Sequence, residues 1–186
     1  MKISNTNKII KLLAILFISA LTFTACSDDH NDDDHDHEEE LITTVTYTLT
    51  NGNDVVTLTF EDLDGEGGNA GTYNVSGPLT ASATYTGAIK LENTTESPSE
   101  NITEEILAEA DEHEFFYTNT AGLTITKTDT DGTNPLGIET TVIAGAAGTG
   151  TLSIILKHEP TKPNDGTSAG AGGSTDVEVT FNVTVQ

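Results

Sequence analysis

The chain has 186 residues and is strongly acidic, with 30 Asp and Glu, seven Lys, no Arg and a net charge of −23. All 30 carboxylates follow residue 25, where four lysines remain, so the segment 26–186 carries a charge of −26. Such a surface cannot neutralise phosphates, which excludes nucleic acid as a partner, and an anionic membrane repels it. The acidity suits cations, basic partners or solubility. The 161 residues of this segment are enough for one domain with a hydrophobic core.

The first 25 residues are typical of a secretory leader. Three lysines precede a short apolar run over residues 12–21, which is too short to span a bilayer comfortably, and small residues lead to Cys26. The tetrapeptide FTAC resembles the lipobox of bacterial lipoproteins. The sequence therefore predicts a lipoprotein signal peptide at 1–25 and a lipidated Cys26, whose acyl chains would anchor the chain stably. The alternative is an ordinary secretory leader followed by an incidental cysteine.

An acidic pair follows the cysteine directly. Ser27, Asp28 and Asp29 resemble the export signal of Bacteroidota surface lipoproteins, which directs a lipidated protein to the outer leaflet. We therefore expect the protein at the outer membrane, held by lipid and exposed on the cell surface.

Residues 26–40 contain nine carboxylates and three histidines and no apolar side chain after Cys26, which predicts a disordered, acidic and His-rich tether. Imidazoles with interleaved carboxylates suit Zn, Cu(II) or Ni. The candidate ligands are His30, His35, Asp36, His37 and Glu38. Ordering a flexible chain costs about 1–2 kcal/mol per residue, so we expect weak and exchanging binding. The alternative is a charged spacer in which histidine is incidental.

From Leu41 onward the pattern changes to alternating apolar and polar residues. ITTVTYTLT and DVVTLTF flank an Asn-Gly turn, which is a strong hairpin signal. Further alternating runs occur up to the ending DVEVTFNVTVQ, and they are rich in Thr and Val. Eight or nine short strands predict an all-β domain over 41–186, an antiparallel β-sandwich of immunoglobulin-like type.

One segment departs from this alternation. Ser97 with Glu100 forms a capping-box pattern around Pro98, which predicts a helix over about 98–112, running into a strand at 114–118. This helix would be the crossover between strands. The glycine-rich tract 163–174 predicts a flexible loop before the last strand.

The helix and a later strand supply a second candidate metal site. Glu109 and His113 are spaced four apart, and His158 extends the inward face of the strand TLSIILKH. If the two histidines met in space beside a carboxylate, they would form a preformed site. The alternative is that each histidine is a satisfied residue at the edge of the core.

Two acidic turns suggest calcium. Asp62, Asp64 and Glu66 alternate as in a calcium loop, and Asp129 and Asp131 repeat the pattern. Both turns lack the spaced bidentate Glu of an EF-hand, and Asp-Gly is also ordinary turn chemistry.

Catalytic motifs are missing from the sequence. It contains no nucleophile elbow, no phosphate-binding loop and no HExxH, and the single cysteine excludes a disulfide within the chain. We therefore expect a protein that is not an enzyme.

Several segments resemble a family of small flavobacterial (Bacteroidota) outer-membrane lipoproteins. They are HDHEEELITTVTYTLT, VTLTFEDLDGEGGNAG, ITEEILAEADEHEFFY, LKHEPTKPNDG and GGSTDVEVTFNVTVQ. Members are commonly labelled as type 1 periplasmic-binding-fold superfamily proteins, a label that implies repeated strand–helix units, whereas the pattern here predicts one helix. The resemblance implies a TonB-dependent receptor as partner and a role in presenting a ligand such as a metal. The leading hypothesis is thus a metal-capturing surface lipoprotein, and the alternative is a non-enzymatic interaction or adhesion module.

Overall fold

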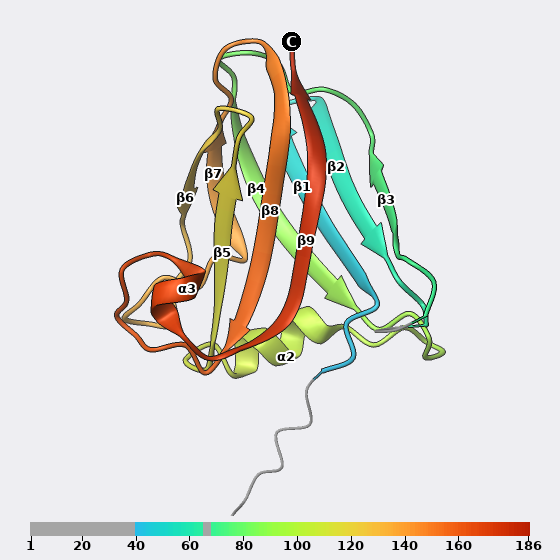
Figure 1. Cartoon of the computed structure of the whole chain (residues 1–186), viewed down its shortest axis with the longest axis vertical. Helices are drawn as coiled ribbons and strands as arrows, with labels where there is room; N and C mark the ends of the chain where they lie inside the picture. Colours follow the sequence, from blue (N-terminus) through green and yellow to red (C-terminus); the bar gives the residue numbers. More distant parts are fainter. Residues whose placement is uncertain (1–39, 65–67) are drawn as a thin grey trace, which may run out of the picture. The chain divides into compact units, whose positions relative to one another are not determined.

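The computed structural model describes residues 40–64 and 68–186, which belong to a compact unit spanning 38–186. Nine strands form two antiparallel sheets that pack face to face (Figure 1). This arrangement confirms the predicted all-β antiparallel sandwich. The six-stranded sheet has the order β3-β2-β1-β4-β7-β6, and the three-stranded sheet has the order β5-β8-β9.

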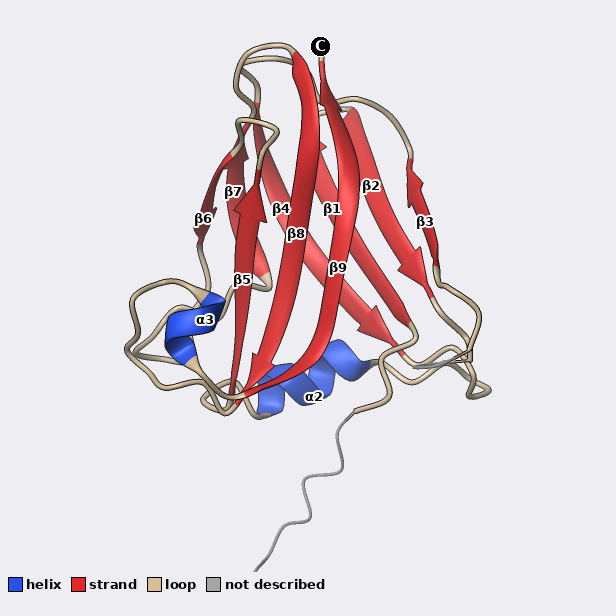
Figure 2. Ribbon diagram, viewed as in Figure 1, coloured by secondary structure: helices blue, strands red, loops and turns tan. Residues whose placement is uncertain are grey.

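The strands of the larger sheet are β1 (Thr44–Asn51), β2 (Asp54–Glu61), β3 (Thr72–Val75), β4 (Thr84–Glu92), β6 (Thr124–Lys127) and β7 (Glu139–Ile143). The strands of the smaller sheet are β5 (His113–Asn119), β8 (Gly148–His158) and β9 (Ser174–Val185). Figure 2 shows the strands of both sheets in red, with helices α2 (Ile102–Ala108) and α3 (Ser168–Ala171) at one end of the sandwich.

Alternation of side chains along the strands builds the core. Val45, Tyr47 and Leu49 of β1 are at most 1 % exposed, while the threonines between them are partly exposed on the other face. Burying one such side chain contributes about 1.5–3 kcal/mol, so the period-two pattern determines which face of each strand turns inward. The β1–β2 turn closes at Gly52, whose φ of 60° is the left-handed conformation that glycine adopts readily.

The helix predicted over 98–112 is shorter than expected. Helix α2 spans Ile102–Ala108, because Asn93 and Glu100 exchange both backbone hydrogen bonds, at 3.1 and 3.0 Å, in an isolated antiparallel bridge. This bridge keeps Glu100 extended, so the capping box predicted at Ser97 does not form and Asn101 caps the helix without a side-chain bond. Helix α2 still connects the two sheets, as predicted, by joining β4 to β5.

The tract 163–174 is more ordered than predicted. A four-residue helix, α3 (Ser168–Ala171), forms within it, and the side chain of Thr167 accepts a hydrogen bond from the N–H of Gly170 at 3.0 Å. Ala171 is fully buried, so this loop packs onto the sandwich at the end where β5 begins and β8 ends.

Several predictions fall outside the described residues: the signal peptide, the lipidation site Cys26, the export signal Ser27–Asp29, all tether ligands up to Glu38, and Glu66. Within 40–64 and 68–186, no helix is long and apolar enough to cross a membrane.

Candidate metal centre

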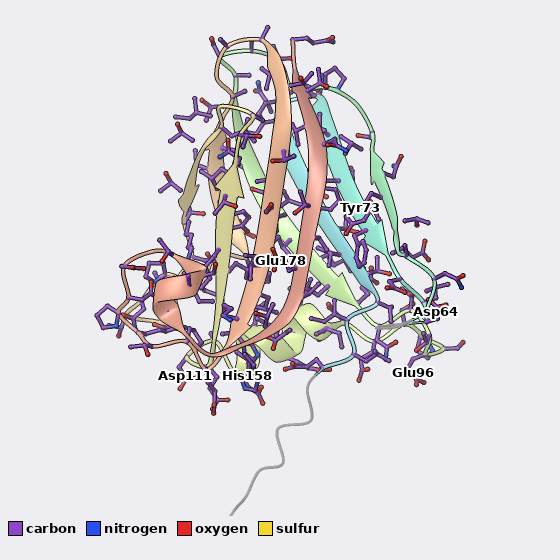
Figure 3. The ribbon with its side chains drawn as sticks, viewed as in Figure 1. Asp64, Tyr73, Glu96, Asp111, His158 and Glu178 are labelled. Atoms are coloured by element: carbon purple, nitrogen blue, oxygen red, sulfur yellow. The ribbon has the colours of Figure 1, made fainter. Side chains whose placement is uncertain are left out.

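The two histidines of the domain lie side by side. His113 is the first residue of β5 and His158 the last residue of β8, and the antiparallel register places them directly opposite each other. Their rings stack with centroids 4.8 Å apart and planes inclined by 15°. Both are buried, at 0 and 7 % exposure. Figure 3 labels His158 at the end of the sandwich that α2 covers.

A backbone carbonyl orients the His113 ring. Its Nδ1 lies 3.1 Å from the carbonyl oxygen of Glu109. Because a carbonyl only accepts hydrogen bonds, Nδ1 carries the proton and Nε2 of the neutral ring presents a lone pair. Metal-binding histidines in proteins are commonly oriented by this contact.

Carboxylates surround this lone pair. The His113 Nε2 atom lies 3.5 Å from Glu40 Oε1 and 3.9 Å from Asp176 Oδ2, too far for hydrogen bonds. His113 Nε2 and Glu40 Oε2 are buried without a hydrogen-bond partner. Two ligands bound tetrahedrally at about 2.05 Å lie about 3.3 Å apart, so the separation of 3.5 Å to Glu40 is close to a zinc coordination edge, while that of 3.9 Å to Asp176 is about 0.6 Å longer.

His158 has its own carboxylates. Its Nε2 lies 3.7 Å from Glu112 Oε2, and the ligand atoms of Glu112, His158 and Glu159 all lie within 4.8 Å of one another. Glu159 has a φ of 49°, a left-handed conformation that costs a residue other than glycine about 1–2 kcal/mol. Its N–H donates to the carbonyl oxygen of Glu112 at 2.6 Å, which ties the end of β8 to the turn before β5.

We call these seven residues the histidine centre: Glu40, Glu109, Glu112, His113, His158, Glu159 and Asp176.

A β-bulge brings Asp176 into the histidine centre. Leu156 pairs with Val177, but Lys157 pairs with Thr175, so Asp176 is an extra residue on β9. Strict alternation from the inward Val177 would point Asp176 outward, whereas its side chain is fully buried. A bulge that redirects a side chain in this way is frequent beside functional sites.

Lys162 supports the turn that carries His113. Its Nζ donates to the carbonyl oxygens of Ala110 and His113, at 2.7 and 2.6 Å, and to Asp131 Oδ2 at 3.1 Å. The lysine side chain is only 6 % exposed. These contacts join the start of β5 to the loop after β8 and fix the backbone that carries His113.

The potential around the histidine centre is negative. Burial raises the pKa of Glu105, one turn before Glu109 on the same side of α2, and the charges of Glu100, Glu40 and Glu109 raise it further. The part of this shift that comes from Glu100, Glu40 and Glu109 shows that their negative charges favour added positive charge nearby.

The predicted calcium turns have a different arrangement. Asp64 accepts hydrogen bonds from the N–H and side-chain amide of Asn69, at 3.0 and 2.8 Å, and these bonds lower its pKa. The backbone N–H of Asp64 lies 3.3 Å from Asp62 Oδ1. These bonds stabilise the turn, and the described residues there provide two carboxylates.

The second acidic turn is part of a loop over residues 128–137, which we call the acid loop. The two carboxylate oxygens of Asp129 accept from the N–H groups of Gly137 and Ile138, at 2.8 and 2.9 Å. Asp131 accepts from Asn134 and Thr133 as well as Lys162, and the backbone bond from Asn134 contributes most to holding the pKa of its carboxyl far below the ordinary value. These carboxylates build the loop.

Sequence patterns identified three of the seven residues, namely Glu109, His113 and His158. They missed Glu40, which was assigned to the tether alone, and Asp176, because nothing in DVEVTF indicates a bulge. Glu112 and Glu159 are adjacent in sequence to the two histidines, and this adjacency was the available signal.

Comparisons with known proteins add no relative. No protein-family model, no curated protein and no solved structure matches this chain. Its candidate function therefore depends on its own residues.

Proposed function

We propose that the protein is an outer-membrane lipoprotein, exposed on the cell surface, that captures a divalent transition metal ion and presents it to a TonB-dependent receptor. The lipid on Cys26 anchors it, the tether raises the local ion concentration, and the histidine centre holds the ion. Catalysis has no part in this proposal.

One observation carries the metal proposal. The stacked histidines are buried, and carboxylate oxygens lie 3.5–3.9 Å from their Nε2 atoms. The Nε2 atom of His113 has no hydrogen-bond partner. A buried Nε2 atom opposite carboxylates is unfavourable unless a metal cation, or a proton on Nε2, lies between them.

The donor set indicates which cation fits. Imidazole nitrogens with carboxylate oxygens suit Zn, Cu(II) and Ni, whereas calcium and magnesium prefer oxygen alone. Zinc is favoured among them, because the separation between His113 Nε2 and Glu40 Oε1 is close to a tetrahedral coordination edge.

The location and the partner rest on the sequence. The leader, Cys26 and the acidic pair after it support surface lipidation, and the family resemblance supports a TonB-dependent receptor. A charge of −26 adds electrostatic attraction for cations near the membrane surface.

Isothermal titration with Zn²⁺, Cu²⁺ and Ni²⁺ tests the metal proposal. The protein is the mature chain, 26–186, carrying Cys26→Ser so that it stays soluble without lipid. We compare it with two variants: a tether variant with His30, His35 and His37 changed to Ala, and a domain variant with His113→Gln and His158→Gln.

We expect the tether variant to keep the tightest binding and the domain variant to lose it, by about 100-fold or more. Circular dichroism verifies that the domain variant folds, and glutamine keeps most of the imidazole volume. If none of the three proteins binds any of the ions more tightly than micromolar, the metal proposal is wrong. If only the tether variant loses binding, the ion is held by the tether.

A second experiment tests location and partner. The wild-type chain should fractionate with the outer membrane and be cleaved by protease added to whole cells, while Cys26→Ala should lose the membrane association. Purification of the lipidated protein from native membranes should recover a TonB-dependent receptor. Recovery without any such receptor would contradict the partner assignment.

A non-enzymatic interaction or adhesion module is the second candidate. It is favoured by the edge strand β3, where Tyr73 is 50 % exposed and its ring lies 4.8 Å from that of Phe60. An edge strand with apolar neighbours is a site at which a partner strand can pair. Under this alternative, Tyr73→Ser would abolish receptor recovery, while the domain variant would leave it unchanged.

A further inference from the structure

The two imidazoles of the histidine centre do not converge. A metal ion binds histidine in the plane of the ring, along the Nε2 lone pair. The two ring planes are within 15° of parallel, and the centroids are separated by 4.8 Å in a stacked arrangement. An ion in the plane of His113 therefore lies outside the plane of His158, so one ion cannot bind both lone pairs well.

The ligand atoms divide in the same way. The ligand atoms of Glu40, Glu109 and His113 lie within 4.8 Å of one another, and those of Glu112, His158 and Glu159 form a separate group with the same limit. We call the first group, with Asp176 added, the inner position, and the second group the outer position. Each position combines one imidazole with at least two carboxylates, the composition of a zinc or copper site.

The two positions differ in burial. Around the inner position, the side chains of His113 and Asp176 are fully buried, that of Glu40 is 10 % exposed, and Glu109 is an exposed residue. Around the outer position, the side chain of Glu112 is 35 % exposed and Glu159 is an exposed residue. An ion in the inner position would exchange slowly, whereas the outer position is open to ions from solution.

Charge supports two ions over one. The five carboxylates carry five negative charges when all are ionised, so one divalent ion leaves three and two ions leave one. Lys162 lies nearby, but its ammonium group is already bonded to two carbonyl oxygens and Asp131. Uncompensated charges of one sign are costly in a partly buried site.

We infer that the histidine centre binds two divalent transition metal ions, a slowly exchanging one at the inner position and an exchangeable one at the outer position. This inference rests on the proposed metal function. The outer ion is the one more available to a partner, because Glu112 is partly exposed and Glu159 is exposed.

Native mass spectrometry and titration with Zn²⁺ count the ions. The tether variant removes the tether histidines, so that the remaining ions belong to the domain. We expect two bound Zn²⁺ per chain. A Glu112→Gln, Glu159→Gln pair should lose the weaker ion and keep the tighter one. A Glu40→Gln, Asp176→Asn pair should weaken the tighter ion by about 10-fold or more and keep the other.

Glu178→Gln is the matched control, because this exposed residue of β9 lies two positions from Asp176 and outside the histidine centre. It should leave both ions bound. His113→Gln and His158→Gln, tested singly, should each remove a different ion. These variants conserve polarity and size, and circular dichroism confirms their fold.

Each result supports or overturns the inference. One Zn²⁺ per chain, lost with either histidine substitution, would mean that a single ion bridges the rings; the two-ion inference would then be wrong and the proposed function would stand. If neither the tether variant nor the unmodified mature chain binds Zn²⁺, both the two-ion inference and the proposed metal function are wrong.

Discussion

The histidine centre and the acid loop are both rich in carboxylates, and they sit close together at one end of the sandwich, joined by Lys162. In the acid loop, backbone N–H groups satisfy both oxygens of Asp129 and hold Asp131 ionised. In the histidine centre, the lone pair of His113 and an oxygen of Glu40 have no donor. The number of carboxylates therefore does not distinguish a metal site from a structural turn. What distinguishes the two regions is whether hydrogen-bond donors satisfy their carboxylate oxygens.

The largest expected effect comes from a substitution at Gly173, whose backbone packs against the end of β8. Gly173 has a φ of 70°, and a Cβ there would collide with the carbonyl oxygen of His158. Gly173→Ala should cost about 3–4 kcal/mol, from the left-handed conformation and the collision together, and it should weaken zinc binding by displacing the end of β8. Urea denaturation with and without Zn²⁺ measures both effects.

Gly172→Ala is the control for this substitution. Gly172 has the same φ of 70°, but a Cβ there meets nothing within 4 Å. It should cost only the conformational part, about 1–3 kcal/mol, and leave zinc affinity unchanged. Equal effects of the two substitutions would contradict the packing of Gly173 against His158.

Replacing Lys162, which joins the histidine centre to the acid loop, should affect both regions. Lys162→Met deletes three hydrogen bonds and leaves the carboxylate of Asp131 buried at 4 % exposure, so we expect a loss of about 3 kcal/mol. Lys90→Met is the control, because Lys90 is 54 % exposed in its pair with Glu92 and should cost about 0–1 kcal/mol. Thermal unfolding compares the two, and similar losses would show that Lys162 does not brace the turn.

A smaller effect, on zinc affinity alone, is expected from a substitution in the carboxylates of the histidine centre. Glu40→Gln keeps the shape of the side chain and removes its charge, so zinc affinity should fall about 10-fold, or about 1.4 kcal/mol, while the apo protein remains as stable. Glu39→Gln, the neighbouring carboxylate in sequence, should change affinity little. Competition titration against a chromophoric chelator measures both, and equal losses would mean that only the net charge of the segment matters.

The smallest effect is expected from calcium. Because the oxygens of Asp129 already accept backbone N–H groups, millimolar Ca²⁺ should leave Tm unchanged. Zn²⁺ at about 100 times its Kd should instead stabilise the fold by about 2.7 kcal/mol. A rise of Tm with Ca²⁺ that Asp129→Asn abolishes would contradict the structural role of the acid loop.

Much of the fold was predictable from local patterns. Period-two alternation identified the strands and their inward faces, because the side chains that point inward along each strand are apolar and buried. The Asn-Gly turn identified the β1–β2 hairpin. The start of α2 was not predictable. It is delayed by the backbone bridge between Asn93 and Glu100, which closes a turn that no helix or strand pattern in the sequence indicates.

The sequence by itself determined a strongly acidic β-sandwich and placed His158 at the end of an inward face and His113 at the edge of the apolar stripe of a predicted helix. Only the tertiary structure decided that His113 and His158 meet, because the register between β5 and β8 depends on how both strands pack. It also decided the role of Asp176, because a bulge reverses the alternation that sequence patterns rely on. Glu40 joins them because the chain enters β1 beside the turn after α2, a proximity that sequence distance conceals.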